Sequence, residues 1–194
     1  MFQPGKHVFM AVVALWAATG CEPQMGSVAG TTDQAELSRI AVEASGWEVR
    51  KAAAEKLADQ AVLARIALDD ESPAVRAAAI DAMTGQPYLA YVALRATHES
   101  DRAAADRKIT DQVVLSNYIQ QVEDPKLIDA VLNDRLTSQA LIAWIAINAP
   151  GANVREAASR KVTDYDIYEA AAAASPSKWI RTTAFAPTMA QGNN

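Results

Sequence analysis

Apolar residues recur in this chain with the spacing of two short amphipathic helices, repeated about every 26 residues. The phrase VRKAAAEKLADQ returns four times, and the five copies occupy 49–60, 75–86, 101–112, 128–139 and 154–165. Counted from the first residue of each copy, positions 0, 3, 4 and 8 are apolar with one exception, Asp101, which places them on one face of a helix. Positions 13, 14, 17 and 18 are apolar in the same way. Each copy therefore predicts a first helix and a second helix.

The interval between copies is nearly constant. The copies begin at Val49, Val75, Asp101, Ile128 and Val154, and a sixth begins at Ile180, so that the steps are 26, 26, 27, 26 and 26 residues. TDQAELSRIAVEA at 32–44 matches a second helix, and Pro187 ends the sixth copy early. Because so small a pair of helices cannot bury its apolar face alone, we expect an all-α stack of half, five and half units over 32–189. The tail AQGNN at 190–194 is expected to be disordered.

Polar residues at the predicted helix starts support this division. The phrases ADQ, TGQ, TDQ, TSQ and TDY precede the second helices, and their Thr, Ser and Asp side chains can accept bonds from the free N–H groups there. A capping residue followed by proline precedes three of the first helices, at Ser72-Pro73, Asp124-Pro125 and Ser175-Pro176. Each unit is therefore predicted to be two helices joined by a short turn.

The stretch VRKAAAEKLADQAVLARIALDDES resembles the short HEAT-like repeats of bacterial α-solenoid proteins. The leucine-rich-repeat variant family has a similar pattern. The HEAT-like resemblance implies a right-handed α-solenoid whose second helices line the concave face.

The N-terminus predicts export. Residues 8–18 are eleven apolar residues, too few to span a bilayer but enough for a signal peptide, and ATGC at 18–21 resembles the lipobox of bacterial lipoproteins. The resemblance implies that residues 1–20 are a signal peptide and that Cys21, the only cysteine, carries a lipid. Residues 21–31 would then be a flexible tether. An ordinary secreted protein with a stray thiol and an uncleaved membrane anchor are the alternatives. We expect a location in the bacterial cell envelope, facing the periplasm. The resemblance to lipoproteins also favours the outer membrane, because Glu22 follows Cys21 where the usual inner-membrane retention signal is aspartate.

Composition excludes several functions. With a net charge of −5 and no basic stripe, the chain is a poor candidate for binding nucleic acid. His98 is the only histidine after the signal peptide, so that no zinc set or Cys–His pair can form, and there is no phosphate-binding loop. The sequence therefore predicts no catalytic residue, no cofactor and no metal, and hence not an enzyme.

Two columns of polar residues are interpreted as structural. One column contains the arginines Arg50, Arg76, Arg102, Arg155 and Arg181 and is interrupted by Asp129. We expect these arginines to bond carboxylates and carbonyls between units rather than an anion. The other contains glutamines, which we expect to satisfy backbone groups of the loops: Gln34, Gln60, Gln86, Gln112 and Gln139.

The remaining candidate is a surface opposite the apolar stripe of the second helices. Its residues are Arg39, Arg65, Tyr91, Asn117 and Trp144, with Ala170 at the end. Exposed Tyr, Trp and Arg anchor protein interfaces, although these rings could instead pack against neighbouring helices. We therefore expect a lipid-anchored envelope scaffold that binds a protein or peptide partner through this column. The alternatives are a structural subunit of an envelope complex and, less favoured, a HEAT-like enzyme or cofactor-binding protein.

Overall fold

The computed structural model describes residues 25–174, and every regular element among them is a helix, as the sequence predicts. These residues divide into two compact units, one ending at Lys108 and the other beginning at Ile109. Unit 1 contains α2 (Met25–Gly30), α3 (Gln34–Glu43), α4 (Trp47–Ala54), α5 (Gln60–Asp69), α6 (Pro73–Ala82), α7 (Gln86–Arg95) and α8 (Glu99–Arg107). Unit 2 contains α9 (Gln112–Ile119), α10 (Pro125–Ala130), the π-helix η1 (Val131–Arg135), α11 (Gln139–Asn148), α12 (Ala152–Ser159) and α13 (Tyr165–Ala174). The predicted signal peptide, Cys21, the sixth copy at Ile180 and the tail at 190–194 lie outside the described residues.

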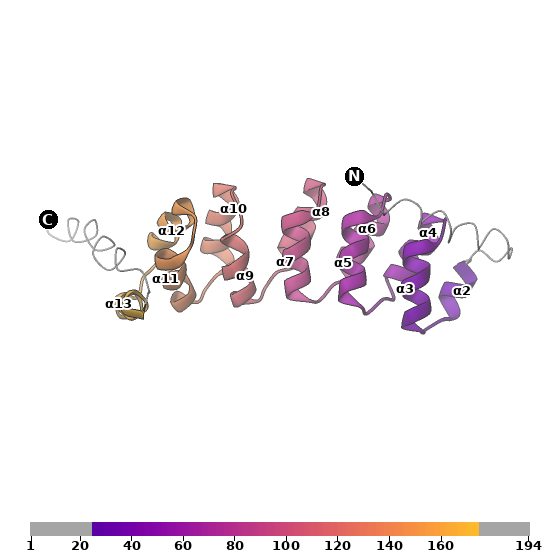
Figure 1. Ribbon diagram of the computed structural model, residues 1–194, viewed down its shortest axis with the longest axis horizontal. Helices are drawn as coiled ribbons and strands as arrows, with labels where there is room; N and C mark the ends of the chain where they lie inside the picture. The colour runs from indigo at the N-terminus through magenta and orange to yellow at the C-terminus, as the bar shows by residue number, and fades with distance from the viewer. Residues whose placement is uncertain (1–24, 175–194) are drawn as a thin grey trace, which may run out of the picture. The chain divides into compact units, whose positions relative to one another are not determined.

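Unit 1 is built as two layers (Figure 1). The first helices α2, α4, α6 and α8 pack on one another in sequence, and the second helices α3, α5 and α7 form the other layer. The consecutive pairs in most extensive contact are α3/α4, α5/α6 and α7/α8, which are joined by three-residue loops. Gln34, Gln60 and Gln86 are the first residues of α3, α5 and α7. Each second helix therefore makes its tight antiparallel pair with the next first helix, across the three-residue loop.

The predicted apolar positions form the core of this unit. Ala53, Ala79 and Ala105 are fully buried at position 4 of the first helices, where their small side chains let neighbouring first helices approach closely. Position 8 is buried as well, but Leu57 and Met83 lie just beyond the ends of their helices, in the turn. The first helices are thus shorter than the apolar stripe suggests, and the last residue of the stripe closes the space below the turn.

Most of the predicted caps are present. The carboxylates of Asp33, Asp59 and Asp111 accept hydrogen bonds from the first N–H groups of α3, α5 and α9, and Ser138 does the same for α11. Asp124 caps α10. Ser72 occupies the predicted cap position of α6 and Pro73 follows it in the first turn, but the Ser72 side chain makes no capping hydrogen bond.

The tether predicted at 21–31 differs from the structure where the structure describes it. Met25–Gly30 form α2, and Val28 is buried at 1% exposure. The Lys56 ammonium donates to the carbonyls of Val28 and Ala29, 2.8 and 2.9 Å away, which supplies partners that the end of a short helix lacks. For these residues the expectation of an unstructured tether is wrong. The N-terminal half unit is preceded by a first helix of its own.

Unit 2 repeats the arrangement: α9, α11 and α13 pack in sequence, as do α10 and α12. Its irregularity is η1, a π-helix in which the Leu136 N–H donates to the Val131 carbonyl at 2.7 Å. The capping residues of the first and second helices are 14 residues apart here, from Asp124 to Ser138, but 13 apart from Ser72 to Gly85. The extra residue of the 27-residue step therefore lies inside this first helix, and the wider π turn accommodates it.

This insertion corrects the alignment of the arginine column. The column arginines lie four residues after the cap, at Arg50, Arg76, Arg102 and Arg155. Four residues after Asp124 is Ile128, which is 1% exposed, whereas Asp129 is exposed. A buried apolar residue, not Asp129, thus interrupts the arginine column.

Candidate partner-binding surface

The predicted column lies on the exposed side of the second helices. We call the positions two, six and ten residues after each second-helix cap the second-helix face. All five predicted residues lie six residues after a second-helix cap, and all are exposed. They are Arg39, Arg65 and Tyr91 in unit 1, and Asn117 and Trp144 in unit 2. Tyr91 retains 50% of its accessible surface and Trp144 45%. The alternative that these two rings are tucked against a neighbouring helix is therefore wrong.

The charged members of the column in unit 1 differ in how they are paired. The Arg39 guanidinium donates to the Glu36 carboxylate one turn away at 2.7 Å, and this hydrogen bond raises the pKa of Arg39. Both side chains remain about 40% exposed, so that the pair contributes little to stability. Arg65 is exposed and forms no ion pair with any residue of the described range. Its charge is available to a partner.

Tyr91 is part of a larger aromatic area on α7. The Arg95 guanidinium lies 6.0 Å from the centre of the Tyr91 ring, at the outer limit of a cation–π contact. Tyr88, one turn before Tyr91, is 40% exposed. Sequence reasoning assigned Tyr88 to the apolar stripe and did not single out Arg95. Their spacing of three and four residues from Tyr91 could have identified both.

In unit 2 the second-helix face of α9 and α11 has no charged residue. Val113, Asn117 and Gln121 stand at its three positions on and after α9, and Ala140, Trp144 and Asn148 stand at those of α11. Val113 is 58% exposed, the largest value among the exposed large apolar side chains of residues 25–174. Sequence reasoning missed Val113, which its position four residues before Asn117 could have indicated.

The arginine column has the structural role that was expected. Arg50 binds Asp70 through Nε at 2.7 Å and through a second nitrogen at 3.0 Å, which raises the pKa of Arg50, and it donates to the carbonyls of Ala44 and Ser45. Arg76 binds Asp101 at 2.6 Å and the carbonyls of Asp70 and Glu71. Arg102 and Arg155 donate to the equivalent two carbonyls of their own preceding loops, those of Ala96 and Thr97 and those of Ala149 and Pro150. These guanidiniums hold the loops between units, so they are not an anion-binding ladder.

The glutamine column is structural as well, and it links consecutive units. Each side chain bonds the turn that follows about 24 residues later: Gln34 accepts from the Ala58 N–H, Gln60 from Thr84 and Gly85, Gln112 from Thr137 and Ser138, and Gln139 from Thr163. Gln86 donates to the Lys108 carbonyl, as Gln34 does to Lys56. Asp59 and Asp111, the residues before Gln60 and Gln112, are helix caps.

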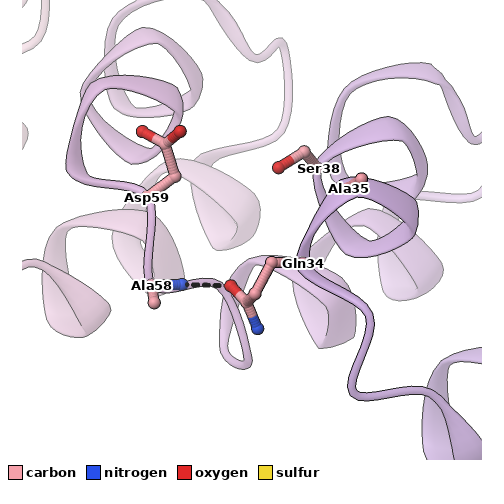
Figure 2. A pocket seen from close by; sticks show the side chains of 5 residues that line it. All are labelled: Gln34, Ala35, Ser38, Ala58 and Asp59. Atoms are coloured by element: carbon pink, nitrogen blue, oxygen red, sulfur yellow. Dashed lines mark hydrogen bonds between the residues drawn. The ribbon is translucent and has the colours of Figure 1, made fainter.

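One shallow hollow lies between α3 and the start of α5 (Figure 2). It is lined by Gln34, Ala35, Ser38, Ala58 and Asp59. The dashed line in Figure 2 is the bond from the Ala58 N–H to Gln34, and Asp59 is the α5 cap. The polar groups of the hollow are thus largely engaged in holding the turn.

The described part of the chain contains no cluster of metal-binding side chains. His98, before α8, and Glu99, its first residue, are both exposed. Among residues 25–174, no three His, Cys, Asp or Glu side chains are close enough to share an ion. Within the same range every buried side-chain nitrogen and oxygen has a hydrogen-bond partner. None of the helices described combines the length and the apolar character required to cross a membrane.

Comparison of the sequence with models of known families, with curated proteins and with solved structures gives no significant match.

Proposed function

We propose that this protein is a scaffold that binds a protein or peptide partner through its second-helix face. The observation that supports this proposal is the exposure of Tyr91 and Trp144 at the same position of two second helices. Tyr, Trp and Arg are the residues that contribute most to binding at protein interfaces. The other repeated polar columns are engaged in holding units together, which leaves this column available.

The proposal includes an architecture and a location. Unit by unit, the two layers and the bonds between consecutive turns agree with the short HEAT-like repeats that the sequence resembles, and a right-handed solenoid is the arrangement proposed for the whole chain. The N-terminal sequence supports export and lipidation at Cys21, so the partner is sought in the cell envelope. No nucleic acid, metal or cofactor is part of the proposal.

Photo-crosslinking in living cells tests the function. Benzoylphenylalanine is placed at position 91 or 144, and at the exposed positions 77 and 133 of the first-helix layer as controls. We expect a discrete protein adduct from 91 or 144 and none from the controls. Equal adducts from all four positions, or none from any, would contradict a partner-binding face. An adduct between two copies of the chain alone would favour the structural-subunit alternative.

Lipidation has a separate test. Radiolabelled palmitate is expected to enter the wild-type protein and not the Cys21→Ala variant, since Cys21 is the only cysteine. Equal labelling of both proteins would rule out the anchor without affecting the binding face.

A further inference from the structure

The second helix α11 has the composition of a helix that is buried on every side. Its sequence, QALIAWIAIN, contains no charged residue, and Ile142, Ala143, Ile145, Ala146 and Ile147 fill the core of unit 2. A helix that is apolar all round is normally covered all round. Ala140 and Trp144 on its outer side are nevertheless exposed. We therefore expect the outer side of α11 to be covered by a bound partner.

The neighbouring helix α9 extends the same surface. Its sequence QVVLSNYI also has no charge, and it contacts α11 within unit 2. We define the α9/α11 face as Val113, Asn117, Ala140 and Trp144. The matching face of unit 1 carries charges at Arg39, Glu43, Arg65, Asp69 and Arg95. The contrast matters because a charged group brought onto the α9/α11 face would lose water without gaining a partner.

Asn117 adds a specific polar contact to this face. Its side-chain amide is exposed and makes no hydrogen bond with any residue between 25 and 174, whereas the Gln121 and Asn148 amides donate to the carbonyls of Asn117 and Trp144 on their own helices. A carboxamide offers a donor and an acceptor together, which matches the N–H and C=O of an extended main chain. Asn117 and Trp144 both lie six residues after their caps, on adjacent helices.

The size of the face favours a short segment over a second copy of the chain. Two packed helices of eight and ten residues, about 12 and 15 Å long and about 9 Å apart, present a face on the order of 300 Å². A stable protein dimer buries about 800 Å² on each partner. An extended chain advances about 3.3 Å per residue, so that about six residues would span the face.

We propose that the α9/α11 face binds a short, extended, uncharged segment of the partner, whose apolar side chains cover Trp144 and Val113 and whose main chain bonds the Asn117 amide. This proposal rests on the proposed function and specifies the chemistry of its ligand. Affinity comes from covering the indole and the valine, and the absence of charge on both sides provides selectivity.

The test uses random twelve-residue peptides displayed on phage and selected on the full chain in mild detergent. Selected sequences are then made as fluorescein-labelled peptides, and binding is measured by fluorescence anisotropy. We expect a shared core of about six residues without Asp, Glu, Lys or Arg. Trp144→Ala and Val113→Asp should each weaken binding at least tenfold and Asn117→Ala about fivefold, whereas the control Trp47→Ala, which removes an equally exposed indole from the first-helix layer of unit 1, should change it less than twofold. All four side chains are exposed, so the variants are expected to fold, and circular dichroism checks this.

Other outcomes overturn the inference, each in a recognisable way. Peptides that bind with charged cores, or whose binding depends on Tyr91 and not on Trp144 or Asn117, refute this ligand and leave the proposed function standing. Recovery of no peptide refutes it as well, and adducts at position 144 in cells would then show that the scaffold binds something else. Benzoylphenylalanine at position 113 that reacts with lipid, or with a second copy of the chain, would identify a different occupant.

Discussion

The buried ion pair between Arg76 and Asp101 provides the sharpest test of how unit 1 is held together. The Arg76 Nε and the Asp101 carboxylate are 2.6 Å apart, and their side chains are 6% and 8% exposed. Asp101 occupies the position that is valine in three other units, at Val49, Val75 and Val154. The replacement Asp101→Val therefore restores the usual residue of the repeat and removes the acid. A reading based on the repeat alone would expect it to stabilise the protein.

The structure predicts the opposite for the single change. In Asp101→Val the Arg76 guanidinium stays buried with only two carbonyls as partners, and breaking a buried pair from one side costs about 3 kcal/mol. Arg76→Met should cost about 4 kcal/mol, because it also removes both carbonyl bonds. The double replacement leaves no buried charge, so it should cost less than Arg76→Met alone, and the costs of the two single changes should not add.

Urea unfolding followed by circular dichroism measures these free energies. At 2–4 °C per kcal/mol, Asp101→Val should also lower the melting temperature by about 6–12 °C. The control is Arg39→Ala in the exposed pair with Glu36, which should cost less than about 0.5 kcal/mol and lose even that in salt. A cost below about 1 kcal/mol for Asp101→Val, or costs of the two single changes that simply add, would refute the reasoning.

Three further predictions follow from the bonds between units. Gln60→Leu should cost about 0.5–1.5 kcal/mol and speed amide exchange in the turn before α7, because the exposed Thr84 N–H and the half-buried Gly85 N–H lose their acceptor; unchanged exchange would contradict this role. Deleting Asn133 from η1 should leave the melting temperature unchanged or raise it, since the first helix regains its usual length, whereas deleting Ala77 from α6 should lower it; equal losses would refute the insertion. Lys108→Met should cost about 0.5–1 kcal/mol at low salt by removing its bonds to two carbonyls at the end of α6, and no change in urea unfolding would show those bonds to be unimportant.

Much of the fold could be predicted because each unit repeats the same local demands. The apolar spacing identified the core positions, and Asp and Ser at the turns identified most helix starts. The roles of Gln60 and Arg50 could also be inferred, since an amide in a turn and a guanidinium beside acids and carbonyls have few other uses.

The parts that escaped prediction depend on contacts between distant residues. α2 has weak helix-forming residues, and it is stabilised by burial of Val28 and by Lys56 from 28 residues away. The position of the inserted residue was within reach of sequence reasoning, because Asp124-Pro125 was already recognised as a helix start. Aligning the copies on apolar residues instead of caps placed Ile128 one position too early.

The candidate surface was predictable in position but not in exposure. The position six residues after a cap lies opposite the buried stripe, whichever residue occupies it. Whether a Tyr or Trp ring at that point bends down onto a neighbouring helix depends on the side chains around it, and their arrangement follows from the tertiary structure. Comparison of the repeats identified only one column of exposed positions, so the exposed Tyr88 and Val113 beside that column were not predicted.

Differences among the 26-residue repeats of this chain indicate which positions serve the fold. The glutamine column keeps its residue type at all five predicted positions, and the arginine position keeps its type in four repeats, because these side chains bond the loops and turns that join consecutive repeats. The position five residues after the cap of the first helices is exposed or half-buried, and it holds only Lys, Ala, Asp or Glu, as expected of a surface that meets water. The sixth position of the second helices follows neither rule: along the chain it is Arg, Arg, Tyr, Asn, Trp and Ala. Neither the bonds between consecutive repeats nor solubility requires Tyr and Trp there, so the variation at this position supports a role of these side chains in binding.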